Sequence, residues 1–97
     1  MQNMIEEQLE ELLVDEELEE VLSGYTSSIV VYNDDHNTFE WVIESFVDVL
    51  SHSSAQAEQL AFLIHFKGKA NVKSGALDEL KGFKDALIDR GLSAVIE

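Results

Sequence analysis

Hydrogen-bonding side chains are concentrated in one short segment, which reads Asn33, Asp34, Asp35, His36 and Asn37. An apolar run precedes this segment and an amphipathic one follows it. Adjacent carboxylates and amides collect negative charge and hydrogen-bond acceptors, which suit a metal ion, an acid–base pair or a bound cation. The apolar neighbours favour a ligand in which a cationic group is attached to an apolar one.

A catalytic or metal-binding role finds little support elsewhere in the chain. Adjacent residues such as Asp34 and Asp35 point to opposite faces of an extended segment, which works against a shared catalytic proton. The sequence contains no H-E-x-x-H, P-loop, G-x-S-x-G or EF-hand pattern, and its three histidines, His36, His52 and His65, lack zinc-ligand spacing. We therefore expect no enzyme activity, no metal and no cofactor. A solvated turn that merely precedes a helix remains an equally simple interpretation.

His65 is the second unusual residue, because it lies in a strongly apolar segment next to Ile64. A lone histidine in such a place is more often a core or boundary residue than a ligand contact. It gains a functional role only if the fold brings it beside the turn that holds Asn33 and Asp34.

Charge excludes several classes of function. The net charge is −14, and residues 1–24 hold nine acidic residues and no basic one. Nucleic-acid binding needs clustered Lys and Arg, so we expect a cationic partner or a basic channel instead. The chain has no cysteine for disulfides and no apolar stretch of the roughly 18 residues that a membrane span needs. We expect a soluble cytoplasmic protein that binds neither nucleic acid nor membrane.

The chain divides into an acidic extension with its linker, residues 1–26, and a core domain, residues 27–97. With 97 residues in all, the chain has room for one small hydrophobic core. Apolar residues in the extension have roughly helical spacing, but the crowded glutamates oppose an isolated helix. The extension is therefore predicted to be either a solvated tail or a helix that forms against a partner.

The core domain begins with a β-branched and aromatic run, 29–32, which predicts a strand. Asn37 and Glu40 fit a capping box in which Asn37 is the N-cap. Apolar residues then recur from Phe39 at helical spacing, which predicts an amphipathic helix over 39–50.

A polar, serine-rich break separates this helix from a second one. The second helix is predicted to run from a Ser53 cap, paired with Gln56, to about Phe66, with Gly68 as its left-handed end. The apolar run 60–64 predicts that this helix is buried on more than one side.

The remaining residues predict a short strand over 69–73, a helix over 76–90 that Gly91 ends, and a final strand over 92–96. The order β-α-α-β-α-β is typical of an α+β domain in which helices pack on one side of a small sheet.

Two segments resemble a known family. Residues 32–42, Tyr-Asn-Asp-Asp-His-Asn-Thr-Phe-Glu-Trp-Val, are similar to the Asn-Asp-Asp-x-Thr-Pro-Met-Glu-Phe-Val signature of the ClpS adaptors of Clp proteases. Residues 64–70, Ile-His-Phe-Lys-Gly-Lys-Ala, are similar to that family's Val-His-x-x-Gly-x-Ala segment, at matched spacing. The resemblance covers residues 27–75 well and 76–97 loosely.

ClpS adaptors are not enzymes. The resemblance implies a protein that binds substrates beginning with Leu, Phe, Tyr or Trp and delivers them to the AAA+ unfoldase of the Clp protease, of a ClpA-like or ClpC-like kind. It also implies a small three-stranded antiparallel sheet with three helices on one side, preceded by an extension. We expect the adaptor to act as a monomer.

The resemblance also assigns a binding site. Contacts to the α-amino group of the substrate would come from Asn33, Asp34, Asp35, Asn37 and His65. The pocket for the first side chain would be lined by Thr38, Phe39, Val42, Ala61, Ile64 and Leu92. A free α-amino group has a pKa of about 8, so it is mostly cationic at neutral pH and suits this polar set.

Three departures from the family pattern bear on this site. Asn37 and Thr38 stand where the family has Thr-Pro, so the Asn37 amide would replace the family's hydroxyl as helix cap and hydrogen-bond partner. Phe39 stands where the family has Met, which stiffens that wall. Ala61 also stands where the family usually has Met, so the pocket would admit Ile or Val as well.

Docking to the unfoldase would use charges of the third helix, where Glu79 and Lys81 are the candidates. The acidic extension would engage the unfoldase during delivery. Two other functions remain open from the residues alone. One is a generic acidic protein-interaction domain, similar to the C-terminal domain of the ribosomal stalk protein, and the other is a small hydrolase that uses Asp34 and His65.

Overall fold

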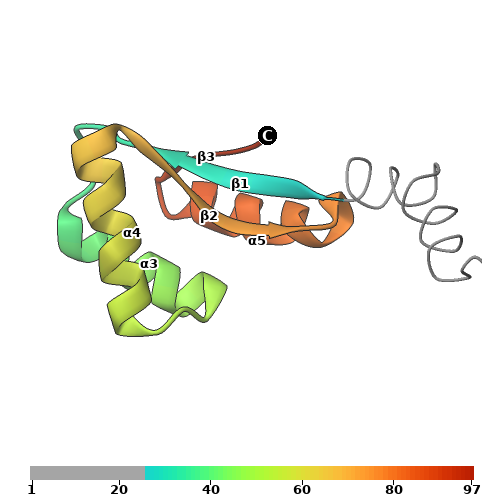
Figure 1. Cartoon of the computed structure of the whole chain (residues 1–97), viewed down its shortest axis with the longest axis horizontal. Helices are drawn as coiled ribbons and strands as arrows, with labels where there is room; N and C mark the ends of the chain where they lie inside the picture. Colours follow the sequence, from blue (N-terminus) through green and yellow to red (C-terminus); the bar gives the residue numbers. More distant parts are fainter. Residues whose placement is uncertain (1–25) are drawn as a thin grey trace, which may run out of the picture.

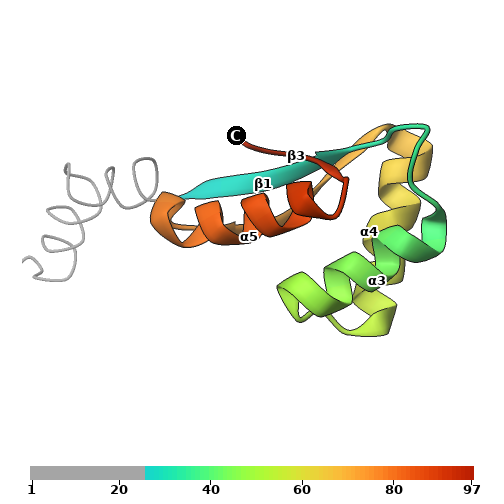
Figure 2. The same ribbon diagram turned by 180° about the vertical axis from the view of Figure 1, so that it is seen from behind.

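The computed structural model describes residues 26–97, so the predicted acidic extension lies outside the described residues apart from Thr26. The described residues form one antiparallel sheet with the strand order β2–β1–β3, and the helices lie on one side of it (Figure 1, Figure 2). The elements in chain order are β1 Ser27–Tyr32, α3 Phe39–Leu50, α4 Ser54–Lys67, β2 Lys69–Gly75, α5 Leu77–Asp89 and β3 Ser93–Ile96. The predicted α+β class and element order are confirmed.

The central strand β1 carries the core. In this strand, Ile29 and Val31 are 0% and 2% exposed. They pack in one cluster with Phe46, Leu80 and Leu87 from the helices. Burial of such apolar area is the main stabilising term in a small domain. The strand begins at Ser27, before the predicted start at residue 29.

The end of β1 lies beside the end of α4. Tyr32 pairs with Lys69 of β2 and with Ser93 of β3. The N–H of Asn33 then donates to the carbonyl of Gly68 at 2.9 Å. The polar turn that follows β1 therefore starts next to the last turn of α4.

Helix α3 has the predicted bounds but a different cap. Thr38 is the N-cap, because its backbone is extended and its hydroxyl accepts from the N–H of Trp41 at 3.0 Å. The prediction of an Asn37 cap is wrong. The side-chain amide of Asn37 instead donates to the Asp34 carboxylate and, at 2.9 Å, to the carbonyl of Gly91. Gly91 is remote in sequence, so no local pattern could show this competing partner.

Helix α4 has the predicted ends. The hydroxyl of Ser53 accepts from the N–H of Gln56 at 3.1 Å, which confirms the cap. Gly68 follows the helix with a φ of 96°, a left-handed conformation that glycine adopts without steric cost.

Only one face of α4 is buried. Ala57, Ala61 and Ile64 are buried, whereas Phe62 and Phe66 are 45% and 72% exposed. The prediction of burial on more than one side is therefore wrong. The main neighbours of α4 among the described elements are α3 and β2, which leave its other face in solvent.

The C-terminal half follows the prediction closely. Strand β2 continues to Gly75, slightly beyond the predicted end at residue 73. Helix α5 lies under the sheet, with Leu80 and Leu87 fully buried, and Gly91 follows it with a φ of 92°. None of the helices in residues 26–97 is long and apolar enough to cross a membrane.

One arginine fixes α3 to the end of α5. The indole N–H of Trp41 donates to the carbonyl of Arg90 at 2.9 Å, and the Arg90 guanidinium lies 5.0 Å from the centre of the Trp41 ring. The guanidinium also reaches the carboxylate of Asp48 at 3.0 Å and the buried hydroxyl of Ser45 at 3.4 Å. These contacts hold α3 in place as one wall of the cavity described next.

Candidate functional site

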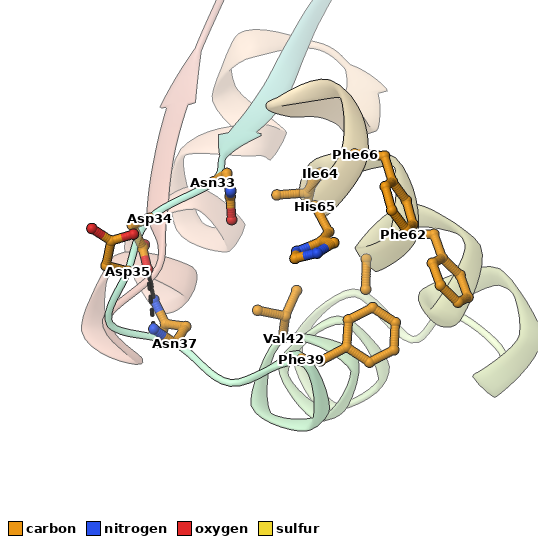
Figure 3. Close-up of a pocket in the computed structure, with 11 residues that line it drawn as sticks. Asn33, Asp34, Asp35, Asn37, Phe39, Val42, Phe62, Ile64, His65 and Phe66 are labelled. Atoms are coloured by element: carbon orange, nitrogen blue, oxygen red, sulfur yellow. Dashed lines mark hydrogen bonds between the residues drawn. The ribbon is translucent and has the colours of Figure 1, made fainter.

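A cavity of about 490 Å³ lies between the turn after β1 and the facing sides of α3 and α4 (Figure 3). Its lining includes all five residues predicted to bind an α-amino group and four of the six predicted for the side-chain pocket. The full lining is Asn33, Asp34, Asp35, Asn37, Phe39, Val42, Ala61, Phe62, Ile64, His65 and Phe66.

Asp34 organises the polar turn. Its Oδ1 accepts from the backbone N–H groups of His36 at 2.9 Å and Asn37 at 3.0 Å. The Asn37 amide bridges both carboxylate oxygens at 3.0 and 2.9 Å, and the Ser93 hydroxyl donates to Oδ2 at 3.0 Å. The turn is therefore built around one carboxylate, with β3 attached to it through Ser93.

These contacts also set the charge of Asp34. Partial burial acts to raise the pKa of its carboxyl group. Hydrogen bonds from the backbone of Asn37 and His36, from the Ser93 hydroxyl and from the Asn37 side chain act in the opposite direction and lower the pKa below its ordinary value. Asp34 is therefore an anion at neutral pH.

Asn33 and His65 face the cavity from two different elements. Asn33 comes from the end of β1 and His65 from the last turn of α4, and both side chains point into the cavity (Figure 3). Both residues are exposed, so a ligand can reach them from solvent. The hydrogen bond between Asn33 and Gly68 accounts for their proximity, because Gly68 follows His65 by less than one helical turn.

The apolar side of the cavity comes from the two helices. Ala61 and Ile64 of α4 are buried, and Phe39 and Val42 of α3 are half-buried. Leu92 lines a smaller hollow of about 20 Å³ beside the cavity, which shares the residues Asn33, Asp34, Asn37, Val42 and Ile64. Thr38 lines neither hollow and caps α3 instead.

The sequence analysis missed several residues of this site. Phe62 and Phe66 line the cavity, although their helix was predicted to be buried on more than one side. Their spacing of four residues on the helix that carries His65 was the available signal. Ser93 and Gly91, which hold the turn, gave no such signal because their partners are remote in sequence.

Glu79 and Lys81 lie far from the cavity. Both are exposed on α5, which begins just after Gly75. Gly75 pairs with Ser27 at the start of β1, whereas the cavity adjoins the other end of that strand. A strand of this length spans about 20 Å, so the two regions are separate surfaces.

The cavity has a polar side and an apolar side. Among residues 26–97, no group of three or more His, Asp, Glu or Cys side chains could hold a metal ion. The cavity instead combines an ionised carboxylate, an amide and an imidazole with an apolar wall. That combination suits a cation attached to an apolar group.

The known proteins that this chain is similar to belong to one family. The family described as ClpS, ATP-dependent Clp protease adaptor protein ClpS, matches residues 25–93. Two relatives, the ATP-dependent Clp protease adapter proteins ClpS of Corynebacterium efficiens and Corynebacterium glutamicum, are each 34% identical to this chain over 68 residues. The matched part makes up 70% of this chain and 67% and 68% of the two relatives.

A solved structure has the same fold. Agrobacterium tumefaciens ClpS2 bound to L-phenylalaninamide is similar with a TM-score of 0.72 and 20% sequence identity, over 75% of this chain and 95% of that one. At this identity the likeness concerns the fold alone. On the family match and the two Corynebacterium relatives, this chain belongs to the ClpS family and is a non-catalytic adaptor of the ATP-dependent Clp protease.

Proposed function

We propose that this adaptor binds proteins whose first residue is bulky and apolar, and that it presents them to the AAA+ unfoldase of the Clp protease. The observation that carries the proposal is the lining of one cavity, in which Asn33, Asp34 and His65 lie beside the apolar side chains of Val42 and Ile64. A free α-amino group is a cation next to the first side chain of a protein. L-phenylalaninamide, the ligand of the Agrobacterium ClpS2 structure, has the same combination.

The α-amino group would lie between Asn33 and His65. The amide oxygen of Asn33 and an unprotonated ring nitrogen of His65 are acceptors for its N–H groups. Asp34 already accepts five hydrogen bonds within the protein. Its role would be to supply a fixed negative charge that stabilises the bound cation, with Asp35 adding charge at the rim and Asn37 holding Asp34 in place.

The first side chain would lie against Val42, Ala61 and Ile64. Burying a Leu or Phe side chain contributes roughly 1.5–3 kcal/mol, and a charge-assisted hydrogen bond contributes about as much. Association itself costs at least about 4 kcal/mol, so neither contribution alone gives useful affinity. The site would therefore require a free terminus and a bulky apolar residue together, and would reject internal Leu residues and acetylated termini.

Ala61 would set the choice of first residue. It is 2% exposed and lines the cavity, so its small side chain leaves space beside the ligand. We infer that the site takes β-branched Ile and Val in addition to Leu, Phe, Tyr and Trp.

Delivery would use the other end of the sheet. Glu79 and Lys81 are exposed near the start of α5, about one strand length from the cavity, so an unfoldase bound there would leave the cavity open. We propose these residues as the docking surface for a ClpA-like or ClpC-like unfoldase. An ATP-driven partner of this kind would place the adaptor in the cytoplasm.

Peptide binding tests the proposal. Fluorescence anisotropy would be measured with labelled peptides that differ only in their first residue: Leu, Phe, Trp, Ile or Met, and Leu with an acetylated terminus. We expect Leu, Phe and Trp to bind and the acetylated peptide to fail. Binding that ignores acetylation would overturn the proposal and would favour a generic protein-interaction domain.

Variants of the polar side identify the amine site. Asn33→Ala and His65→Ala should each weaken binding of the Leu peptide by at least about tenfold, which corresponds to loss of one charge-assisted hydrogen bond. His36→Ala is the matched control, because His36 lies in the same turn but does not line the cavity. Equal losses in His36→Ala and His65→Ala would contradict the assignment.

A further inference from the structure

A row of aromatic rings, of which Phe62 and Phe66 are exposed, runs from the mouth of the cavity along α4 (Figure 3). The ring centres of Phe39 and Phe62 are 5.0 Å apart, and those of Phe62 and Phe66 are 5.8 Å apart with planes inclined by 11°. The His65 ring meets the Phe66 ring edge-on at 4.9 Å. Contiguous exposed apolar side chains of this kind usually mark a binding surface.

Phe62 and Phe66 join two hollows. They line the cavity that holds Asn33 and His65, and they also line a second, open hollow of about 630 Å³ on α4. No acidic residue lines the second hollow, which is formed by Gln56, Gln59, Leu60, Phe62, Leu63, Phe66 and Lys67. A peptide that leaves the cavity can therefore continue onto this surface without passing a carboxylate there.

We propose that Phe62 and Phe66 form a second subsite, which takes an apolar side chain from one of the two residues that follow the terminal residue of a bound protein. This subsite rests on the proposed function, because its location is inferred from the position of the first residue in the cavity. It adds a preference that the cavity alone does not impose. The adaptor reads an apolar side chain near the terminus as well as the terminal residue itself.

The spacing of the two rings fits an extended peptide. Residues four apart on a helix lie about 6 Å apart, and an extended chain advances about 6.6 Å over two residues. A peptide that runs from Val42 and Ile64 along α4 would therefore bring its second or third side chain within reach of Phe62 and Phe66.

The subsite is also preorganised. Phe62 is held between Phe39 and Phe66, and Phe66 is held between Phe62 and His65. Rings that are already packed lose little conformational freedom when a ligand covers them, so more of the apolar contact appears as affinity.

Four peptides test the subsite: Leu-Ser-Ser, Leu-Phe-Ser and Leu-Ser-Phe, each followed by the same polar sequence, and an acetylated Leu-Ser-Ser. The measured quantity is the ratio of the Kd of Leu-Ser-Ser to that of each phenylalanine peptide. We expect at least one ratio of about five to ten, which is the gain from partial burial of one aromatic side chain.

Two variants assign that gain to the rings. In Phe66→Ser and in Phe62→Ala the ratio should fall to about one, since the partner for the apolar side chain is gone. Ile88→Ser is the matched control, because Ile88 is an apolar residue as exposed as Phe62, at 45%, and lines neither hollow. Circular dichroism would establish that each variant is folded.

The outcomes are distinct. If Leu-Ser-Ser fails to bind, or binds as well when acetylated, the proposed function itself is wrong. If it binds only with a free terminus but both ratios are one in the unaltered protein, or persist in Phe66→Ser and Phe62→Ala, the subsite alone is wrong. A dimer that Phe66→Ser dissociates in sedimentation velocity, with unchanged ratios, would assign the surface to a second copy and would also overturn the subsite.

Discussion

The N–H of Asn33 donates to the carbonyl of Gly68 at 2.9 Å and thereby joins two segments that lie far apart in the sequence. Asn33 begins the polar turn, and Gly68 ends the helix that carries His65. This bond and the pairing of Tyr32 with Lys69 bring an amide and an imidazole to the same cavity. We therefore expect the conformation at Gly68 to affect stability and, under the proposed function, ligand binding.

Gly68→Ala should destabilise the protein by roughly 1–2 kcal/mol, the cost of a side chain in the left-handed conformation. The φ of Gly68 is 96°, and an added Cβ would meet nothing within 4 Å, so the loss is conformational and not a clash. Urea unfolding measures it. Gly82→Ala is the control, because an added Cβ there also meets nothing within 4 Å but lies inside α5. Gly82→Ala should stabilise the protein by about 0.5–1 kcal/mol. If both substitutions changed the free energy of unfolding in the same direction, this explanation would be wrong.

Asp34 should make stability depend on pH in the acid range. Its hydrogen bonds lower the pKa in the folded protein below the ordinary value of 3.8, despite the opposing effect of burial. The contribution of the carboxylate is therefore complete above the unfolded pKa and is lost as pH falls through the lowered folded pKa. The free energy of unfolding would be measured from about pH 7 to about pH 2. As pH falls, it should decrease less steeply in Asp34→Asn than in the unaltered protein. Identical slopes would show that the turn does not stabilise the ionised carboxylate.

Asn37→Ala should lower stability by about 1–3 kcal/mol, because it removes the donor that the Asp34 carboxylate and the Gly91 carbonyl share. It should also weaken binding of peptides with a free terminus, since Asp34 loses its fixed position. Asn71→Ala is the control, as its amide donates only to exposed serine hydroxyls of the sheet. A loss of binding as large in Asn71→Ala would indicate a general effect on folding.

Arg90→Ala should destabilise by about 1–2 kcal/mol, through loss of the contacts with the Trp41 ring and the buried Ser45 hydroxyl. The ion pair with Asp48 adds little, because both side chains are partly in solvent, at 28% and 47% exposure. Lys84→Ala removes the comparable pair with Asp85 and should change stability by less than about 0.5 kcal/mol. Thermal unfolding would compare the stability of the two variants. Equal losses of stability would show that Arg90 does not anchor α3 to α5.

Ala61→Met should narrow the choice of first residue. A longer side chain at this buried position would fill the space beside Val42 and Ile64, so peptides starting with Ile or Val should lose affinity relative to Leu. The expected change in the Ile-to-Leu ratio is roughly tenfold, the effect of about one or two methylene groups. Ala55→Met, on the exposed first turn of α4, is the control. An unchanged ratio in Ala61→Met would assign the selection to other residues, with Phe39 as the first candidate.

Local patterns were sufficient for most of the secondary structure. The alternation of apolar residues, the Ser53 cap and the glycines at 68 and 91 are read from a few neighbouring residues, and the structure has them as predicted. The two segments that resemble the ClpS family also identified the family, since its signature consists of short contiguous stretches. These features depend on interactions within one helical turn or one strand, so the order of residues alone determines them.

Tertiary structure decided the rest. Thr38 caps α3 because the Asn37 amide is held by the carbonyl of Gly91, a partner that only the folded chain brings near. Phe62 and Phe66 are exposed because α3 and β2 cover one face of α4 and leave the other in solvent. His65 faces the same cavity as Asn33 because β1 ends against Gly68. In each case the deciding contact joins distant segments, and the free energy of such contacts depends on packing that the local sequence does not encode.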